Sequence, residues 1–432
     1  MSRIIVALCV LAALPSFADD QTAPGAGNAL AIETARRSAR VREASAFLLE
    51  QAHQIRNREL RHATLDILTH SDVCARHRKG LTSADKEAIV AALIGAGLVN
   101  PADAASIIGG VKAGVFPPAL GEGTGCVQPP LPFIAAPGST YSSHHAYPGG
   151  LALHTTYNTR SSKALALGYP QTYGGDRDEG DHGHERGHDD GDEDEGWHHS
   201  LLGIDPDIVL AAPIWHDWAK TLVFQWTAVG SEFTELNFGG AGTADNDGRP
   251  GDSRTGGHHI IGVAESMSRG LSPAMVIAQT SAHSNPTLGN EYKVVNWLRA
   301  AAIIARVDPV AKGYLYRDTT GKLRLPPLRQ LGSLDLNAAG QTNVLAEYTI
   351  NNLSDGDFTF SIPVIPSSLA ILGTLAPEFG YDPKGDPARY NTRYRNVVLS
   401  QLSGEFIYLT YSRGGLAAIR AELKALRSRG LI

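Results

Sequence analysis

The amino-acid sequence predicts a mainly α-helical protein whose helices bring histidine and aspartate side chains to one point. Apolar residues recur at helical spacing from residue 28 to about 56 and over most of residues 143–313. In the second region, His258, His283 and Asp308 follow one another at intervals of 25 residues. This spacing suits successive helices that return polar groups to the same end of a bundle. We therefore expect a helical bundle core with an extra N-terminal helical layer and a small mixed C-terminal appendage.

The first residues have the layout of a secretory signal peptide. Arg3 precedes an apolar run at residues 4–14, and small residues end the segment at Ala18. No later apolar run approaches the roughly 20 residues that a membrane helix requires. We therefore predict that residues 1–18 are cleaved and that the mature protein is periplasmic or secreted, with no membrane span. A buried N-terminal helix is the alternative.

The cysteine content agrees with export. Cys9 lies inside the expected signal peptide, so the mature chain keeps Cys74 and Cys126. An even pair in an oxidising compartment predicts a disulfide. This bond would join the N-terminal helical region to the Pro-rich segment at residues 114–140. Two separate free thiols are the alternative.

The N-terminal region and the C-terminal region flank the histidine-bearing domain. Residues 19–140 are expected to form helices, one with Ser83 as its N-cap and one starting at Asn100-Pro101, followed by a loop. Residues 314–432 have a mixed character and no evident role. Within them, residues 358–364 and 406–411 predict strands. Residues 416–427 predict an amphipathic helix.

Two segments interrupt the helical domain at residues 141–313. Residues 174–199 are rich in Asp, Glu, Gly and His and have too few apolar side chains to order themselves, so they are expected to be disordered or ordered by metal. Residues 228–256 are rich in Gly, Asp and Thr and contain an alternating stretch at 231–238. This second segment predicts a hairpin or a lid between two of the polar motifs.

The charge of the chain is unevenly distributed. The formal net charge is −6, but residues 176–195 alone carry eleven acidic and two Arg residues, so the rest of the chain is slightly basic. A hydrophobic content of 43% and a charged content of 19% are typical of a soluble globular protein. Nothing in this balance demands a nucleic-acid partner, and nothing excludes a phosphate substrate.

His216 and Asp217 form the centre of the predicted site. Residues 210–215 before them are apolar, so the pair is expected to project from a buried helix. A charged aspartate in such a place is costly unless it is paired or coordinates a metal. Next to a histidine ligand, its two oxygens can contact two different metals. Lys220 lies three residues on, where it either pairs with Asp217 or reaches a phosphoryl oxygen.

Further histidines lie in similar apolar contexts. His154 follows Pro148-Gly149-Gly150, a turn that predicts a helix start, and His144 and His145 lie just before that turn. His258, His283 and Asp308 lie at the ends of predicted helices. Imidazole nitrogens and carboxylate oxygens are the ligands that borderline divalent metals prefer. The alternative for residues 144, 145 and 154 is three surface histidines.

The order of these motifs resembles the HD-domain metal-dependent phosphohydrolase superfamily over about residues 143–313. His216-Asp217-x-x-Lys220 resembles the central element of that superfamily. The sequence His-His-Ala-Tyr-Pro-Gly-Gly-Leu-Ala-Leu-His-Thr at 144–155 is similar to the branch that contains bacterial HD-domain 3′–5′ exoribonucleases. Gly257-His258-x-x-Ile261-Gly262 is similar to the same branch.

The resemblance implies an HD-type helical bundle that holds two divalent metal ions, which are Fe, Mn, Zn, Ni or Mg. It implies a catalytic role for Asp217, which bridges the metals, and for Lys220, which also assists in binding the phosphate. It implies substrate contacts by His144 and His145. The implied metal ligands are His154, His216, Asp217, His258, His283 and Asp308.

Three departures bear on the substrate. The exoribonuclease branch carries an N-terminal nucleic-acid-binding OB-fold and is cytoplasmic, whereas this N-terminal region predicts helices and export. The residue after His283 is Ser284, where a second histidine often stands in that branch. Nucleic acid is therefore not the favoured partner. A small phosphoester or a nucleotide is favoured, and the sequence does not indicate the oligomeric state.

We therefore expect an exported phosphohydrolase that cleaves a phosphate mono- or diester with a metal-activated hydroxide. A di-iron oxygenase of the HD type is one alternative, because its ligands are similar. The other is a non-catalytic periplasmic metal-binding protein. That alternative depends on five histidines among the acidic residues of the 174–199 segment. These are His182, His184, His188, His198 and His199.

Overall fold

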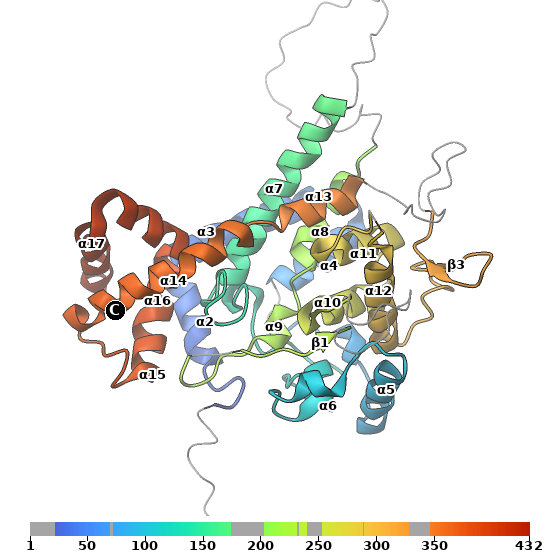
Figure 1. Ribbon diagram of the computed structural model, residues 1–432, viewed down its shortest axis with the longest axis horizontal. Helices are drawn as coiled ribbons and strands as arrows, with labels where there is room; N and C mark the ends of the chain where they lie inside the picture. The colour runs from blue at the N-terminus through green and yellow to red at the C-terminus, as the bar shows by residue number, and fades with distance from the viewer. Residues whose placement is uncertain are drawn as a thin grey trace, which may run out of the picture.

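The computed structural model describes residues 22–69, 72–173, 203–230, 233–239, 253–287, 289–327 and 346–432 of the 432-residue chain. Within these stretches the chain is mainly helical, which confirms the predicted class, and the strands form two short antiparallel pairs (Figure 1). The expected signal peptide at residues 1–18 and the acidic segment at residues 174–199 lie outside the described residues.

The N-terminal part is a layer of helices, as predicted. Side chains set two of the helix starts. Ser38 accepts a hydrogen bond from the Val41 amide at the start of α3, and Thr82 forms a reciprocal capping box with Asp85 at the start of α5. The expected N-cap Ser83 is therefore wrong by one residue. The elements of the layer are α2 (Asn28–Arg37), α3 (Ala39–Gln54), α4 (Arg58–Thr69), η1 (Arg76–Arg78), α5 (Ser83–Gly95), η2 (Pro101–Ala104), α6 (Gly110–Val115) and η3 (Phe133–Ala135).

The helix expected from Asn100 is a single 3-10 turn. The Asn100 side chain accepts from the Ala102 amide, and Pro101 takes the first position, as the sequence suggests for a helix start. The turn ends after one cycle at Ala104. The next helix, α6, begins only at Gly110.

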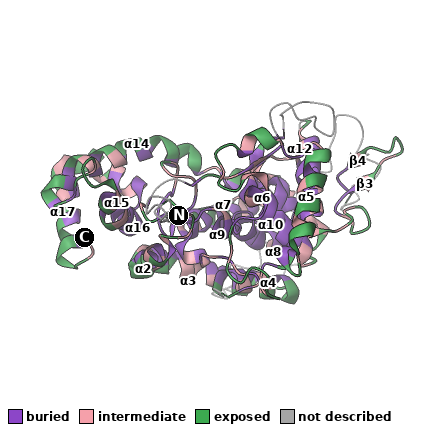
Figure 2. Cartoon of the chain, turned by 90° about the horizontal axis from the view of Figure 1, so that it is seen from below, coloured by how far each residue is buried: buried purple, intermediate pink, exposed green. Residues whose placement is uncertain are grey.

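The central part is a helical core that surrounds the histidine motifs. α7 packs against α3, α8 and α13, and α10 packs against α11 and α12. Every residue of α8 from Ile208 to Trp215 is buried, and α10 is buried from Gly257 to Met267, as Figure 2 shows. The elements are α7 (Gly150–Tyr173), α8 (Pro206–Trp215), α9 (Lys220–Val223), α10 (Gly257–Ser268), α11 (Pro273–Thr280), η5 (Ser281–His283), α12 (Glu291–Ala305) and α13 (Ala346–Ser354).

The expected hairpin between residues 228 and 256 is described only at its base. There β1 (Asn237–Phe238) pairs antiparallel with β2 (Thr255–Gly256), with Asn237 opposite Gly256. A second pair, β3 (Tyr316–Arg317) and β4 (Leu323–Arg324), follows α12. Residues 231–232 and 240–252 lie outside the described part of the chain.

From residue 346 on, the described C-terminal region has helices and no strands, so the strands expected at residues 358–364 and 406–411 are wrong. The first stretch begins α14 (Phe358–Leu375), and the second lies in α17 (Gly404–Ser428). Short apolar runs do not distinguish a strand from a buried helix, and the buried positions of α14 recur at helical spacing. These positions are Ser361, Val364, Ile365, Ser368, Ile371, Leu372 and Leu375.

The remaining C-terminal elements connect α14 to α17 in the chain. They are η6 (Ala376–Phe379), α15 (Pro387–Tyr390), the π-helical turn η7 (Asn391–Arg395) and α16 (Asn396–Leu402). Figure 1 shows α15 and α16 below α14 and α17. The amphipathic helix predicted at residues 416–427 is confirmed as the second half of α17, which kinks at Gly415. α14, the two halves of α17 and the short elements between them share a second apolar core, which Tyr147 also joins.

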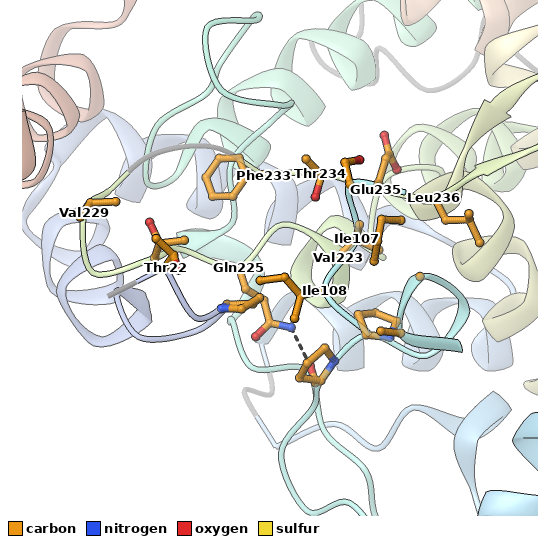
Figure 3. Close-up of a pocket in the computed structure, with 17 residues that line it drawn as sticks. Thr22, Ile107, Ile108, Val223, Gln225, Val229, Phe233, Thr234, Glu235 and Leu236 are labelled. Atoms are coloured by element: carbon orange, nitrogen blue, oxygen red, sulfur yellow. Dashed lines mark hydrogen bonds between the residues drawn. The ribbon is translucent and has the colours of Figure 1, made fainter. Parts of the chain in front are cut away.

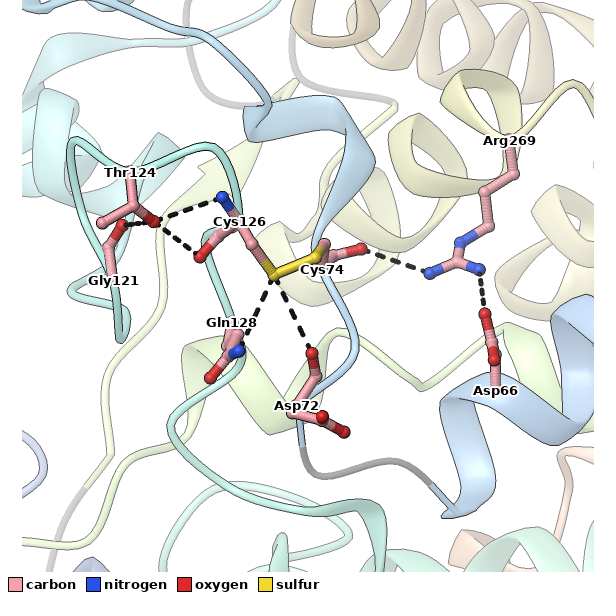
Figure 4. The surroundings of a disulfide bond; sticks show 8 residues. All are labelled: Asp66, Asp72, Cys74, Gly121, Thr124, Cys126, Gln128 and Arg269. Carbon is pink, nitrogen blue, oxygen red and sulfur yellow. Dashed lines mark hydrogen bonds and ion pairs between the residues drawn. A yellow bond between two sulfur atoms is a disulfide. The ribbon is translucent and has the colours of Figure 1, made fainter.

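Cys74 and Cys126 form a disulfide, which confirms the predicted pairing (Figure 4). The bond joins the chain before η1 to the Pro-rich loop. Arg269 reinforces this corner, because its guanidinium donates to the Cys74 carbonyl oxygen at 3.3 Å and to Asp66 at 3.4 Å. A disulfide is typical of proteins from oxidising compartments.

Among the described residues, one helical stretch, Ala346–Phe379, is long and apolar enough to cross a membrane, with a mean hydropathy of 1.6. The core helices of soluble proteins can have the same length and composition. Asp355 and Asp357, in the turn inside this stretch, are both buried among histidines of the core. The stretch is therefore weak support for a membrane span.

Candidate metal centre

Histidine and aspartate side chains from five separate segments meet inside the helical core. His154 comes from α7, His258 from α10 and His283 from η5, while His216 and Asp217 follow α8 directly. Asp355 joins them from the turn after α13. Their ligand atoms form two groups in which all atoms lie within 4.8 Å of one another. The groups are His154, His216 and Asp355, and Asp217, His258 and His283.

The distances in the first group are short. The Nε2 atom of His154 lies 3.0 Å from Asp355 Oδ1 and 3.1 Å from Asp217 Oδ2. The Nε2 atom of His216 lies 3.3 Å from each of the same two oxygens. The second group begins at the other oxygen of Asp217, since Oδ1 lies 3.4 Å from His258 Nε2. Asp217 therefore faces both groups, one oxygen to each.

These separations fit metal ligands. Two atoms bound to one ion at about 2.1 Å lie about 3.0 Å apart at a right angle and about 3.4 Å apart at the tetrahedral angle. His216 Nε2, His258 Nε2 and Asp217 Oδ1 are also buried and have no hydrogen-bond partner among the described residues. Leaving such atoms unsatisfied costs about 1–3 kcal/mol each. Borderline divalent cations would satisfy all three, so the residues present fit a pair of such ions.

In three of the four imidazoles the opposite nitrogen is hydrogen-bonded to an oxygen. Nδ1 of His216 lies 2.8 Å from the Pro213 carbonyl oxygen, and Nδ1 of His258 lies 2.7 Å from Glu235 Oε2. This contact places the ring proton on Nδ1 and leaves the lone pair of Nε2 for a metal. The third such pair is His283 Nδ1 with Thr255 Oγ1 at 3.0 Å. His154 Nδ1 lies 3.0 Å from Asp357 Oδ1 as an ion-pair contact that lacks hydrogen-bond geometry.

Glu235 and Thr255 flank the base of the described hairpin. Glu235 precedes β1 and also accepts from the His258 amide at 3.0 Å, while Thr255 opens β2. The segment expected to act as a lid therefore orients two histidines of the centre. Its alternating pattern at residues 231–238 gave no sign that Glu235 turns inward.

Charges in the centre are mutually dependent. Burial alone would lower the pKa of His216, but the carboxylates of Asp217 and Asp355 raise it to about 9. Burial would raise the pKa of Asp217, but His216 and Lys220 hold it well below its usual range. Burial, with the nearby charge of His258, lowers the pKa of His283 to about 4. Asp217 thus stays ionised, and its negative charge attracts cations to the space between the two groups.

Lys220 is 4% exposed and does not face an open surface. Its ammonium donates to Asp217 Oδ2 and to the Gly138 carbonyl oxygen. Of the two roles that the sequence left open, the structure therefore has the ion pair with Asp217. This contact fixes the orientation of the carboxylate that faces both groups.

Asp308 is not brought to the centre, which corrects its expected place among the ligands. Its side chain is exposed and accepts from the amides of Val310 at 2.9 Å and Ala311 at 3.1 Å. Arg306 ends α12 in the left-handed conformation, with φ 57°, and Asp308 caps the next turn. Asp355 is the carboxylate that lies with His154 and His216. Its only signal in the sequence is a polar turn, Ser354-Asp355-Gly356-Asp357, between two apolar helices.

His144 and His145 lie beside His154, as their place before the Gly149-Gly150 turn suggests. Their ring centroids lie 5.1 Å and 5.6 Å from that of His154. Burial and the neighbouring positive charges of His154 and Lys220 lower the pKa of His144 to about 2, so this imidazole is neutral at physiological pH. Their implied contact with substrate stays a prediction.

Two cavities border the outer parts of the centre. One, of about 310 Å³, reaches Glu235. Figure 3 shows Thr22 and Val229 on one side of it and Glu235 with Leu236 on the other. The second, of about 590 Å³, reaches His145 and Asp357 and lies between α3, α7 and the start of α14. Each cavity thus touches a residue that contacts a histidine of the centre.

Comparison with known proteins adds no relative. No protein-family model matches the chain, and no curated protein and no solved structure matches it.

Proposed function

We propose that this protein is an exported metal-dependent phosphohydrolase that holds two divalent cations between His154, His216, Asp355, Asp217, His258 and His283. One observation carries the proposal. The Nε2 atoms of three imidazoles from three different segments converge on the two oxygens of one buried aspartate, with separations of 3.1–3.4 Å. A buried cluster of this composition without cations would leave several polar atoms unsatisfied.

The proposed chemistry is hydrolysis of a phosphate ester. A pair of bound divalent ions lowers the pKa of a coordinated water toward neutrality and neutralises charge on phosphoryl oxygens. Asp217 connects the two groups, and Lys220 holds one of its oxygens in place. Asn158 donates to Asp355 Oδ1 at 3.1 Å and so fixes the second carboxylate. These contacts preorganise the ligands before substrate arrives.

The resemblance of the motifs at residues 144–155 and 216–220 to the HD superfamily supports phosphoester chemistry over oxygenation. In the proposal the substrate is a small mono- or diester of the nucleotide type. The predicted signal peptide and the disulfide support action outside the cytoplasm.

The test uses purified full-length mature protein, stripped of metal and reloaded with Mn, Fe or Zn. We expect turnover of p-nitrophenyl phosphate or bis-p-nitrophenyl phosphate, and loss of both metal and turnover in Asp217→Asn. The exposed His62 provides the control, since His62→Ala should keep both. Protein that binds two ions but hydrolyses neither ester, nor any nucleotide, would refute the proposal. Oxygen consumption by the iron-loaded protein would support the oxygenase instead.

A further inference from the structure

We infer that the chain holds a third divalent cation outside the proposed pair, between His144, His145 and Asp357. Ligand atoms of these three residues and of His154 all lie within 4.8 Å of one another. The three new ligands do not include Asp217, His216 or His258. Two imidazole nitrogens and one carboxylate form a mixed nitrogen and oxygen site, which suits Zn²⁺, Mn²⁺ or Fe²⁺.

The separation of His145 from Asp357 favours a shared ion over a hydrogen bond. His145 Nδ1 lies 3.8 Å from Asp357 Oδ2, which exceeds the usual range of an N–H···O bond, about 2.7–3.2 Å. Two ligands of one ion bound at about 2.1 Å can be up to about 4.2 Å apart. His145 is 6% exposed, and its Nδ1 is buried with no hydrogen-bond partner in the part of the chain that the structure describes. A cation between the two atoms would satisfy this nitrogen.

The fold holds His145 in an uncommon conformation. Its φ is 53°, in the left-handed region that few non-glycine residues adopt. A Cβ at Gly150 would lie 1.8 Å from the His145 carbonyl oxygen, and a Cβ at Gly138 would lie 2.6 Å from the His145 Cβ. Glycines on both sides therefore let the backbone close around this residue. A non-glycine residue keeps this left-handed conformation only where the surrounding structure imposes it, and such residues cluster at functional sites.

Asp357 links the inferred site to the proposed pair. Its Oδ1 lies 3.0 Å from Nδ1 of His154, while Oδ2 faces His145. On the other side of the His145 ring, Nε2 lies 3.9 Å from Glu405 Oε1, a carboxylate oxygen that is buried and has no hydrogen-bond partner. With Nδ1 on the ion, the ring proton resides on Nε2, and Glu405 is a nearby negative charge rather than a hydrogen-bond acceptor at this distance.

The 590 Å³ cavity gives the inferred site access from solvent. His145, Asp357 and Glu405 line it together with Arg40 and Arg160. A cation held here would face the cavity. In this assignment His144 and His145 bind the ion, in place of the direct substrate contact that the resemblance implies.

Metal stoichiometry tests the inference. Full-length mature protein is loaded with Zn²⁺ or Mn²⁺, freed of excess ion and measured by elemental mass spectrometry, and its crystals give an anomalous-scattering map. We expect three ions per chain, with one peak between His145 and Asp357. His145→Ala should lose that peak alone, so that three ions become two, while His62→Ala keeps three.

Each outcome separates the two proposals. Two peaks at the Asp217 groups and none at His145 would overturn the third site and leave the proposed function intact. A third peak that persists in His145→Ala would overturn the ligand assignment. Should His145→Ala unfold, as judged by circular dichroism, His144→Gln replaces it with the same expected loss of one ion. A peak at His145 without the other two would refute the phosphohydrolase centre alone.

Discussion

Replacing Asp355 by asparagine should cost the protein one metal ion, whereas the same change at Asp308 should cost none. Asn keeps the size of the side chain but removes its negative charge, so the two variants differ only in position. Asp355 Oδ1 lies 3.0 Å and 3.3 Å from two imidazole nitrogens. Asp308 is exposed, and its side chain accepts hydrogen bonds from the amides of Val310 and Ala311 in its own turn.

The magnitude follows from the position of the carboxylate. Groups that only orient a metal ligand typically contribute 10- to 100-fold to metal affinity. Asp355 contacts two imidazoles at ligand spacing, so the loss should exceed the upper end of that range. We expect at least a ~100-fold weaker Kd for one ion, which is about 2.7 kcal/mol.

A competition titration against a chromophoric chelator measures this affinity for Zn²⁺ at pH 7. Wild-type protein and Asp308→Asn should give the same curves, and Asp355→Asn should release one ion early. Circular dichroism of each variant shows whether the fold is kept. Equal affinities for Asp355→Asn and wild type would refute the ligand assignment, and equal losses in both variants would show that aspartate charge acts only at long range.

Three further predictions concern the support of the centre. Glu235→Gln should weaken metal binding 10- to 100-fold, because the uncharged Gln side chain no longer accepts a charge-assisted hydrogen bond from His258 Nδ1. Cys74→Ser should lower the free energy of unfolding by about 4 kcal/mol in urea, since the disulfide spans 52 residues. Burial would raise the pKa of Glu265, but a histidine and an arginine lower it to about 2. Its contribution to stability is therefore complete above about pH 4.3 and declines as the pH falls toward 2, by about 3 kcal/mol in all. Glu265→Gln should lack this part of the acid dependence in urea titrations at each pH.

Controls for these predictions come from the same protein. For Glu235→Gln, unchanged zinc affinity would show that the orienting contact is dispensable. Wild-type protein in reducing agent should lose as much stability as Cys74→Ser. An unchanged urea midpoint in reducing agent would contradict the stabilising role of the disulfide. For Glu265, parallel stability curves of variant and wild type from pH 5 to pH 2 would rule out the depressed carboxyl group.

The sequence predicted the residues of the centre that lie in specific motifs. His154 follows a glycine turn, and His216-Asp217 follows a fully apolar helix, so local chemistry was enough to single them out. Asp308 and Asp355 could not be ranked in this way. Both follow helices, and only the packing of α13 against α7 and α8 brings Asp355 to the histidines. Long-range packing leaves no local signature in a chain taken alone.

The helices were predicted correctly where the spacing of apolar residues fits only a helix. The helices before residue 313 have an apolar stripe of helical period, whereas α14 begins with alternating Phe, Thr, Phe, Ser and Ile, which fits a strand equally well. The packing of α14 against α17 favours the helical conformation, and this contact is not visible in the local sequence. Thr82 and Ser83 are both good helix caps, and Asp85 selects Thr82 through its side-chain contact.

Asp355 and Asp357 stand beyond α12, in the last fifth of the polypeptide. A product of early termination that ends after α12 would carry all six histidines of the proposed sites and Asp217 but would lack Asp355 and Asp357. We expect its affinity for metal to be poor, so with the proposed ligands capture of the ions would report that nearly the whole polypeptide has been made and has folded. Separately expressed halves should each fail to retain metal, and mixing them should restore retention only if they reassemble.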